Sequence, residues 1–211
     1  TVIPTAAERI RTRGENEDPL GEERNTPVPG LVHRYPDRVL FLLTETCSTY
    51  CRYCTRSRIV GDPKDHSLSM DRWNKAIEYI ESNSSIRDVL LSGGDPLTLP
   101  DDTLEWLLSR LRRIPHVEVL RIGTKAPVVM PQRITPALCR MLGRFHPLWM
   151  SIHFTHPSEL TEEVRRACKT LANAGIPLQS QTVLLAGIND DVDTMRRLFH
   201  GLVMMRVRPY Y

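Results

Sequence analysis

The sequence has no long apolar run. None of its hydrophobic stretches approaches the roughly 20 residues that span a bilayer, and no signal-peptide pattern opens the chain. Cysteine is scarce: the chain of 211 residues has five, and this odd number argues against a disulfide framework. A net charge of only +3 gives no indication of nucleic-acid binding. These absences predict a cytoplasmic protein with reduced cysteines that binds neither membranes nor nucleic acids.

Lysine is also rare, with 4 residues against 24 arginines. Arginine forms bidentate contacts with carboxylates and phosphates, so this excess favours anionic ligands, although GC-rich codon usage gives the same excess. The arginines near the cysteines are binding candidates, with an ordinary solvated face as the alternative: Arg34, Arg38, Arg52, Arg56 and Arg58.

Three of the five cysteines lie in one short stretch, whereas Cys139 and Cys168 stand in predicted helices. Cys47, Cys51 and Cys54 stand in TETCSTYCRYC with the spacing C-x3-C-x2-C, directly after an apolar run. Three thiolates from one loop hold three irons of a [4Fe–4S] cube and leave the fourth open to another ligand. A zinc site completed by His33 or His66, and chance spacing, are the alternatives that the cysteines alone leave open.

From residue 37 onward, short runs rich in valine, isoleucine and leucine alternate with amphipathic segments. Strands are predicted at 39–45, 87–92, 117–122, 148–154, 178–185 and 203–208, and helices at 70–83, 101–113, 135–144, 158–174 and 191–202. This alternation predicts an α/β fold of parallel strands with right-handed crossovers, either a partial (β/α)6 TIM-like barrel or an open doubly wound sheet. Residues 1–36 are predicted to form an extended or helical arm and a cofactor-contacting segment, before one domain at 37–211.

Polar residues follow the carboxyl ends of the predicted strands. Gly93, Gly94 and Asp95 come after the second strand, His153 ends the fourth, and Gln181 lies in the fifth. Active sites of barrels and open α/β sheets form at this edge, so a single mouth is predicted to collect these residues. Gly93 and Gly94 would let the backbone approach a ligand closely. The open alternatives are a tight turn capped by Asp95, in place of a ligand contact, and a structural role for His153.

The chain resembles a known family over residues 18–211. The strings PVPGLVHRYPDRVL, CRYCTRSR, DVLLSGGDPL, RIGTKAPVVMPQRITP, HFTHPSEL and RVRPYY stand in the order in which lysine 2,3-aminomutases carry similar ones. These enzymes are members of the radical S-adenosylmethionine (SAM) superfamily. The resemblance implies a partial (β/α)6 barrel of the radical SAM type with an N-terminal arm.

The resemblance also implies cofactors and the residues that bind them. A [4Fe–4S] cluster would cleave SAM to a 5′-deoxyadenosyl radical, which moves an amino group from C2 to C3 of an amino acid bound to pyridoxal 5′-phosphate (PLP). The implied cluster ligands are Cys47, Cys51 and Cys54, and the implied SAM contacts are Gly93, Gly94, Asp95, His153 and Gln181. Arg34, Tyr35 and Arg38 match a PLP-binding segment, and Arg56 matches the arginine that pairs with the substrate carboxylate.

The implied activity is that of an isomerase converting L-lysine to β-lysine. Related enzymes that act on glutamate or arginine, or that make β-lysine for a translation factor, are alternatives, as is a zinc-stabilised module without catalysis. A flavodoxin- or ferredoxin-type electron donor and a homo-oligomer of the full-length protein are expected partners.

One element of the family pattern has no counterpart in this sequence. The PLP lysine of the family lies beyond the barrel, beside a glycine-rich segment. None of Lys64, Lys75, Lys125 and Lys169 stands in such a context. We therefore expect a fragment that binds a cluster but cannot bind PLP covalently by itself.

Overall fold

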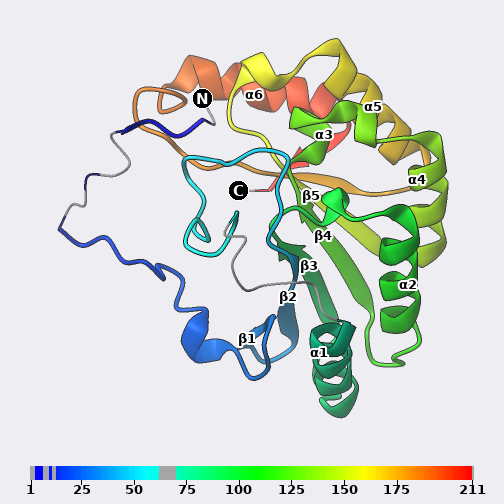
Figure 1. The fold of residues 1–211 in the computed structure, drawn as a ribbon. Coiled ribbons are helices and arrows are strands. Elements are labelled where there is room, and N and C mark those ends of the chain that lie inside the picture. Colours follow the sequence, from blue (N-terminus) through cyan, green and yellow to red (C-terminus); the bar gives the residue numbers. More distant parts are fainter. Residues whose placement is uncertain (1–2, 7–9, 11–12, 62–69, 211) are drawn as a thin grey trace.

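The computed structural model describes residues 3–6, 10, 13–61 and 70–210. Its centre is a seven-stranded sheet whose strands lie side by side in chain order (Figure 1). They are β1 (Leu31–Tyr35), β2 (Arg38–Thr44), β3 (Asp88–Gly93), β4 (Val119–Thr124), β5 (Leu148–His153), β6 (Leu178–Gln181) and β7 (Val207–Pro209). Strands β2 to β7 are parallel and β1 is antiparallel to β2. Because β1 and β7 do not pair in the described part of the chain, the sheet is an open arc, which confirms the predicted partial barrel.

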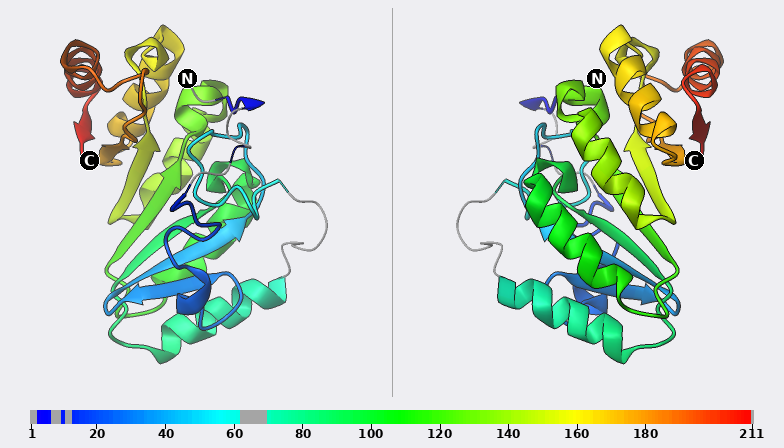
Figure 2. Two further views of the ribbon diagram at one scale, coloured as in Figure 1. Left: turned by 90° about the vertical axis from the view of Figure 1, so that its left-hand side faces the viewer. Right: turned by 90° about the vertical axis from the view of Figure 1, so that its right-hand side faces the viewer.

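The helices cover one face of this arc (Figure 2). They are α1 (Met70–Ser82), α2 (Asp101–Arg112), α3 (Ala126–Val129), α4 (Pro136–Leu142), α5 (Glu162–Asn173) and α6 (Val192–Met204). Thr135, Thr161 and Asp191 begin α4, α5 and α6 by accepting a hydrogen bond from a first-turn N–H, which explains where these helices start. Within the described residues, no helix has the length and apolar character that crossing a membrane requires.

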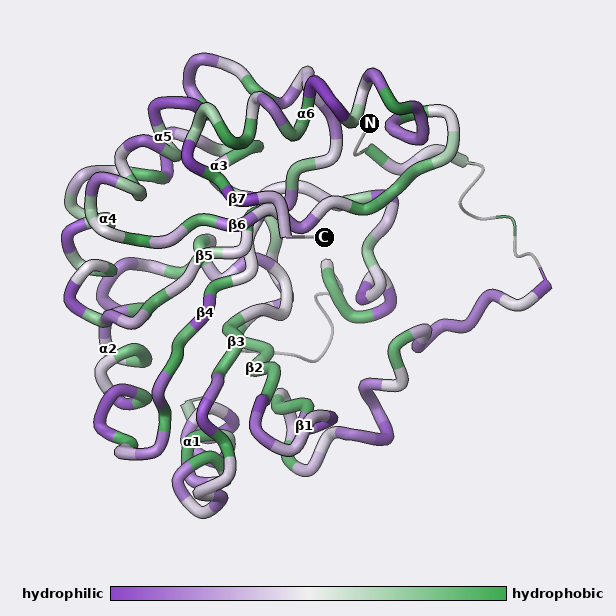
Figure 3. The backbone as a smooth tube through the Cα atoms, turned by 180° about the vertical axis from the view of Figure 1, so that it is seen from behind, coloured by the Kyte–Doolittle hydropathy of each residue, from purple (hydrophilic) through white to green (hydrophobic). Residues whose placement is uncertain are grey.

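The main core lies between the helices and the outer face of the sheet. In β2, Val39, Phe41 and Leu43 point to this face and are buried, as the two-residue period of a strand requires. The buried side chains of α1, among them Ile77 and Ile80, belong to the same core. Figure 3 shows β2 and β3 as mainly hydrophobic, whereas residues 13–26, the N-terminal arm, are mainly hydrophilic.

The inner face of the sheet carries polar side chains. At the amino ends of the strands, the buried Asp88 carboxylate accepts from Arg38 Nε at 2.8 Å and from Arg121 Nε at 2.9 Å. Nearer the carboxyl ends, Gln179 Nε2 donates to Ser151 Oγ at 2.6 Å. The same sheet therefore has an apolar outer face and an inner face built for polar contacts.

Four predictions differ from the structure by more than two residues. The helix predicted at 158–174 begins only at Glu162, because Pro157–Glu159 forms a separate 3-10 turn. Residues 31–35 were expected in the arm, but they form β1, whose Leu31 is buried against the core. The predicted sixth strand starts too early because 203–204 are still helical, and only 207–209 pair with β6. The predicted fifth strand ends too late, since the chain leaves the sheet after Gln181. Short apolar runs suit a helix end as well as a strand, which explains the error at β7.

Candidate active site

The three cysteines lie on one irregular segment, the cysteine loop, residues 45–61, that leaves the carboxyl end of β2. All three are free thiols of intermediate exposure. The two ends of the loop meet, because Gly61 N donates to Glu45 O at 3.0 Å, and a turn inside it joins Cys54 N to Cys51 O at 3.0 Å. In Figure 1 this loop, drawn in cyan, lies beside the carboxyl ends of the strands. The predicted gathering of the cysteines at the sheet edge is what the structure has.

The Gly93–Gly94 pair holds the start of this loop. Asp95 N donates to Thr46 O at 2.8 Å, and Gly94 N donates to Thr44 O. A Cβ atom added at Gly93 would collide with the Thr44 carbonyl, and one at Gly94 with the Thr46 carbonyl; Gly93 also has a positive φ of 117°. Glycine is thus required here by the close approach of two protein backbones.

Asp95 is buried, and its carboxylate is fully used by the protein. It accepts from Leu97 N at 3.0 Å, from Thr124 Oγ1 at 2.6 Å, from Lys125 N at 2.8 Å and from Ala126 N at 2.9 Å. These bonds tie the end of β3 to the end of β4. The Asp95 side chain therefore acts as a cap, which was the alternative to a ligand contact. A contact between Asp95 and SAM stays a prediction.

The surroundings of the thiols disfavour their charged form. Burial, followed by the nearby Asp95 carboxylate, raises the pKa of Cys47 to about 12. Burial also raises the pKa of Cys51, although the Lys125 ammonium lowers it in part. Both thiols keep their protons at neutral pH until a metal displaces them, so metal binding at this loop releases protons.

Tyr53 joins the cysteine loop to β5. Its ring stacks on the His153 ring with centroids 6.3 Å apart, and its hydroxyl accepts from Thr155 Oγ1 at 3.3 Å. Tyr53 is not among the residues predicted from the sequence, although an aromatic residue between two candidate metal ligands in a polar loop is a usable signal.

His153 presents a ring nitrogen that lacks a protein partner. Its Nδ1 is buried with no hydrogen-bond partner among the described residues. Burial, with the positive charges of Lys125 and Arg56, lowers the pKa of His153 to about 4, so the ring is neutral at pH 7. Gln181 on β6 is its register partner. The two predicted residues are therefore neighbours on the inner face, and an orphaned buried nitrogen there fits a polar ligand.

Lys125 lies at this mouth but is not free. Its Nζ donates to Glu159 Oε1 at 2.9 Å and to His153 O at 3.0 Å, while Glu159 Oε2 accepts from Thr155 N at 2.6 Å. The pair is buried, so each charge compensates the other. Lys64 and His66 lie outside the described residues.

Comparison with known proteins decides the family. The family model of the Radical SAM superfamily matches residues 41–199, from β2 to α6. The chain belongs to the radical SAM superfamily. A radical SAM methyltransferase from Sphaerobacter thermophilus has a similar structure, with a TM-score of 0.53 at 17% identity over 85% of this chain and 57% of that one, which supports the shared fold.

Within this superfamily, aminomutases are similar to the chain over almost all its length. The L-lysine 2,3-aminomutase of Fusobacterium nucleatum is 58% identical over 99% of this chain and 49% of its own length. That of Clostridium subterminale is 56% identical over 99% of this chain and 50% of its own. The glutamate 2,3-aminomutase of Clostridioides difficile is 49% identical over 99% and 49%, respectively. The chain thus spans about half the length of the curated relatives it matches.

The donor set at the cysteine loop fits the iron–sulfur cluster that the radical SAM superfamily implies. Among the described residues, no group of three or more His, Cys, Asp and Glu side chains is placed to hold a single metal ion. His33, one candidate fourth zinc ligand, instead has its Nδ1 2.9 Å from the Tyr79 hydroxyl. A cube spreads its three thiolates over three different irons and needs no such convergence.

The residues that the sequence assigns to PLP are not brought to the cysteine loop. Tyr35 pairs with Arg38 where β1 turns into β2, at the opposite end of the sheet from the thiols. Arg38 is bound to Asp88, Arg34 Nη1 donates to Leu20 O at 3.0 Å, and Tyr35 is exposed. A role in PLP binding stays a prediction for these three.

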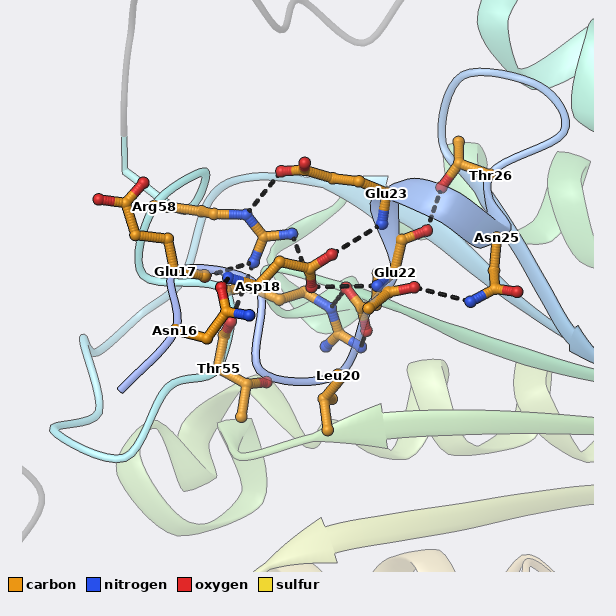
Figure 4. A network of polar contacts seen from close by, with 12 residues as sticks. Asn16, Glu17, Asp18, Leu20, Glu22, Glu23, Asn25, Thr26, Thr55 and Arg58 are labelled. Carbon is orange, nitrogen blue, oxygen red and sulfur yellow. Dashed lines mark hydrogen bonds and ion pairs between the residues drawn. The ribbon is translucent and has the colours of Figure 1, made fainter. Parts of the chain in front are cut away.

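Arg56, predicted to bind a substrate carboxylate, is paired with a carboxylate of the protein itself. Its Nε and Nη2 donate to the two carboxylate oxygens of Glu22, at 2.9 and 2.6 Å. Nearby, Arg58 pairs with Asp18 and Glu23, each at 3.2 Å (Figure 4). The acidic N-terminal arm is thereby bound to the basic end of the cysteine loop, a contact that the sequence analysis did not anticipate.

Proposed function

We propose that the protein to which this chain belongs is a radical SAM amino-acid 2,3-aminomutase, an isomerase that converts L-lysine to β-lysine. The observation that carries the proposal is 58% identity to an L-lysine 2,3-aminomutase over 99% of the chain. The mouth at the strand ends supports it, because the loop that carries the thiols contacts His153 there through the stacked ring of Tyr53.

The chain's own residues divide the work at this mouth. Cys47, Cys51 and Cys54 would hold the cluster through three of its irons. When bound, the cluster and SAM would supply electron transfer and radical chemistry on the substrate. His153, neutral at pH 7, offers its free ring nitrogen to the SAM ribose side without adding a positive charge. Gln181 beside it contributes an amide.

PLP fits the described residues only in part. Lys75 pairs with Asp71 on α1, Lys125 pairs with Glu159, and Lys169 is exposed on α5. Among the described lysines, none presents a free amine at the inner face. We therefore propose that none of the described lysines binds PLP covalently.

A second candidate function differs from the first in its substrate. The similarity to a glutamate 2,3-aminomutase, at 49% identity, makes glutamate the alternative to lysine. A flavodoxin- or ferredoxin-type electron donor, a homo-oligomeric whole protein and a cytoplasmic location complete the proposal.

Anaerobic reconstitution of the full-length protein tests it. We expect iron and sulfide in equal amounts, 5′-deoxyadenosine after reduction in the presence of SAM, and β-lysine from L-lysine on addition of PLP. Formation of β-glutamate from L-glutamate instead would move the assignment to the second candidate. Bound zinc without sulfide would refute the radical chemistry altogether.

A further inference from the structure

Arg56 is held from one side only. A guanidinium group has five N–H donors: one on Nε and two on each terminal nitrogen. Glu22 takes the Nε–H and one Nη2–H in a side-on pair. The other fork, formed by Nη1 and the second Nη2 hydrogen, has no acceptor among the described residues. This end-on fork matches a second carboxylate in the same bidentate way.

Glu22 is well placed to fix that fork. Its side chain is almost fully buried, and the Arg56 side chain is 16% exposed. The Glu22 backbone is itself anchored, because its N–H donates to Asp18 Oδ1 at 3.0 Å and its carbonyl accepts from Thr26 Oγ1 at 2.8 Å (Figure 4). A side chain held by a buried, anchored partner loses little further freedom when a ligand binds.

The guanidinium also lies near the mouth. Its positive charge is among those that act on the buried ring of His153, at the carboxyl end of β5. Arg56 follows Cys54 by two residues, and its carbonyl accepts from Val60 N at 2.9 Å inside the cysteine loop. The free fork is thus part of the segment that carries the thiols.

We propose that Glu22 is a positioning residue: it holds Arg56 side-on, so that the end-on fork receives the α-carboxylate of the amino-acid substrate. This inference rests on the proposed function and adds to it a residue of the N-terminal arm. Both carboxylates bind Arg56 at the same time, and Glu22 sets the direction from which the substrate's carboxylate is bound.

The test uses the full-length protein with its cofactors and the variants Glu22→Ala and Glu22→Gln. It measures KM and kcat for L-lysine or L-glutamate, whichever the wild type converts, and the inhibition constant of the corresponding α-carboxamide. In Glu22→Ala, we expect KM to rise about tenfold or more. The inhibition constant of the carboxamide should change less, because the Arg56 fork, once misdirected, loses its preference for a carboxylate. Glu22→Gln, which keeps one acceptor oxygen, should fall between Glu22→Ala and the wild type.

Glu23→Gln is the matched control, since Glu23 is the next residue and pairs with Arg58 of the same loop. It should leave KM, the inhibition constant and the iron content unchanged. Equal weakening of the amino acid and the carboxamide in the Glu22 variants would assign Glu22 a purely structural role and overturn the inference. Tighter substrate binding in Glu22→Gln would also overturn it, because Glu22 would then merely neutralise Arg56. A wild-type protein that converts neither amino acid would refute the proposed function itself.

Discussion

The two ends of the inner face differ in how their polar groups are satisfied. At the amino ends of the strands, the Asp88 carboxylate forms ion pairs with both Arg38 and Arg121 at hydrogen-bond distance. At the carboxyl ends lie thiols with raised pKa values and a histidine nitrogen that has no hydrogen-bond partner among the residues the structure describes.

The difference separates stability from binding within one sheet. A buried polar group without a partner lowers the stability of the folded state, so it persists where a ligand completes it. The paired end requires nothing more than the protein itself. Substitutions at the paired end should therefore change the free energy of unfolding, and substitutions at the mouth should mainly change what the protein binds.

The largest effect is expected for Cys47→Ala. Removing one of three thiolates leaves the cluster with too few protein ligands, so iron content and SAM cleavage should fall below detection while the unfolding temperature of the metal-free protein stays close to that of the wild type. Iron and sulfide analysis with thermal unfolding measures both. Cys139→Ala, at a buried thiol in α4, is the control: it should lower stability by about 1 kcal/mol and keep the iron.

Gly94→Ala should disturb both properties at once. The new Cβ would meet the Thr46 backbone carbonyl, which cannot move without displacing the cysteine loop. We expect a loss of about 3 kcal/mol in the free energy of unfolding, together with reduced iron content after reconstitution. Gly123→Ala in β4 meets nothing nearer than 3.7 Å and should cost less than about 1 kcal/mol. Equal effects of the two substitutions would contradict the steric explanation.

Asp88→Asn examines the paired end alone. The two arginines would lose the negative charge between them, and the free energy of unfolding should fall by about 2 kcal/mol in denaturant titrations. Iron content should remain at the wild-type value, because the thiols lie at the other end of the strands. A marked loss of cluster would show that the two ends are not independent.

The last effect, no larger than that of Asp88→Asn, is a pH dependence at His153. Its pKa is about 4 in the folded protein against an ordinary value of 6.5, so the unfolded chain binds more protons between these values. Stability should therefore decrease as the pH falls from 6.5 to 4, by about 2 kcal/mol after allowance for the partial exposure of the ring. His153→Gln should flatten this part of the curve of unfolding free energy against pH. An unchanged slope in that variant would place the titration elsewhere.

The local pattern of apolar residues was sufficient to predict most strands of the sheet. Strands β2 to β5 were predicted within two residues at each end, because each is a run of apolar residues whose outer-face positions are buried. Position at the strand ends also predicted that the cysteine loop and His153 would lie at one edge of the sheet, where Tyr53 of the loop stacks on His153. Strand β1 was missed because it is short and lies between Pro29 and Pro36, in a setting like that of the arm before it, and only pairing with β2 makes it a strand.

The rest of the site depends on contacts between distant residues. Nothing in the sequence around Glu22 indicates that it pairs with Arg56, which is 34 residues away. The sequence around Asp95 is the same whether its carboxylate binds a ligand or caps a turn. Only the three-dimensional structure, which brings Thr124 and Lys125 close to it, distinguishes the two roles. Asn189, buried after β6 and bound to the carbonyls of Thr155 and Val183, was invisible for the same reason.

The order of the strands also bears on how the chain folds during synthesis. Since each strand pairs with the strands next to it in sequence, every new strand–helix unit can add to an edge that is already present. The cysteine loop, however, leaves the ribosome well before β5 and the segment that follows it, which supply His153 and Thr155 as contacts of Tyr53. We therefore expect the loop to reach its final shape only after the middle of the sheet has formed, which would delay cluster insertion until late in folding.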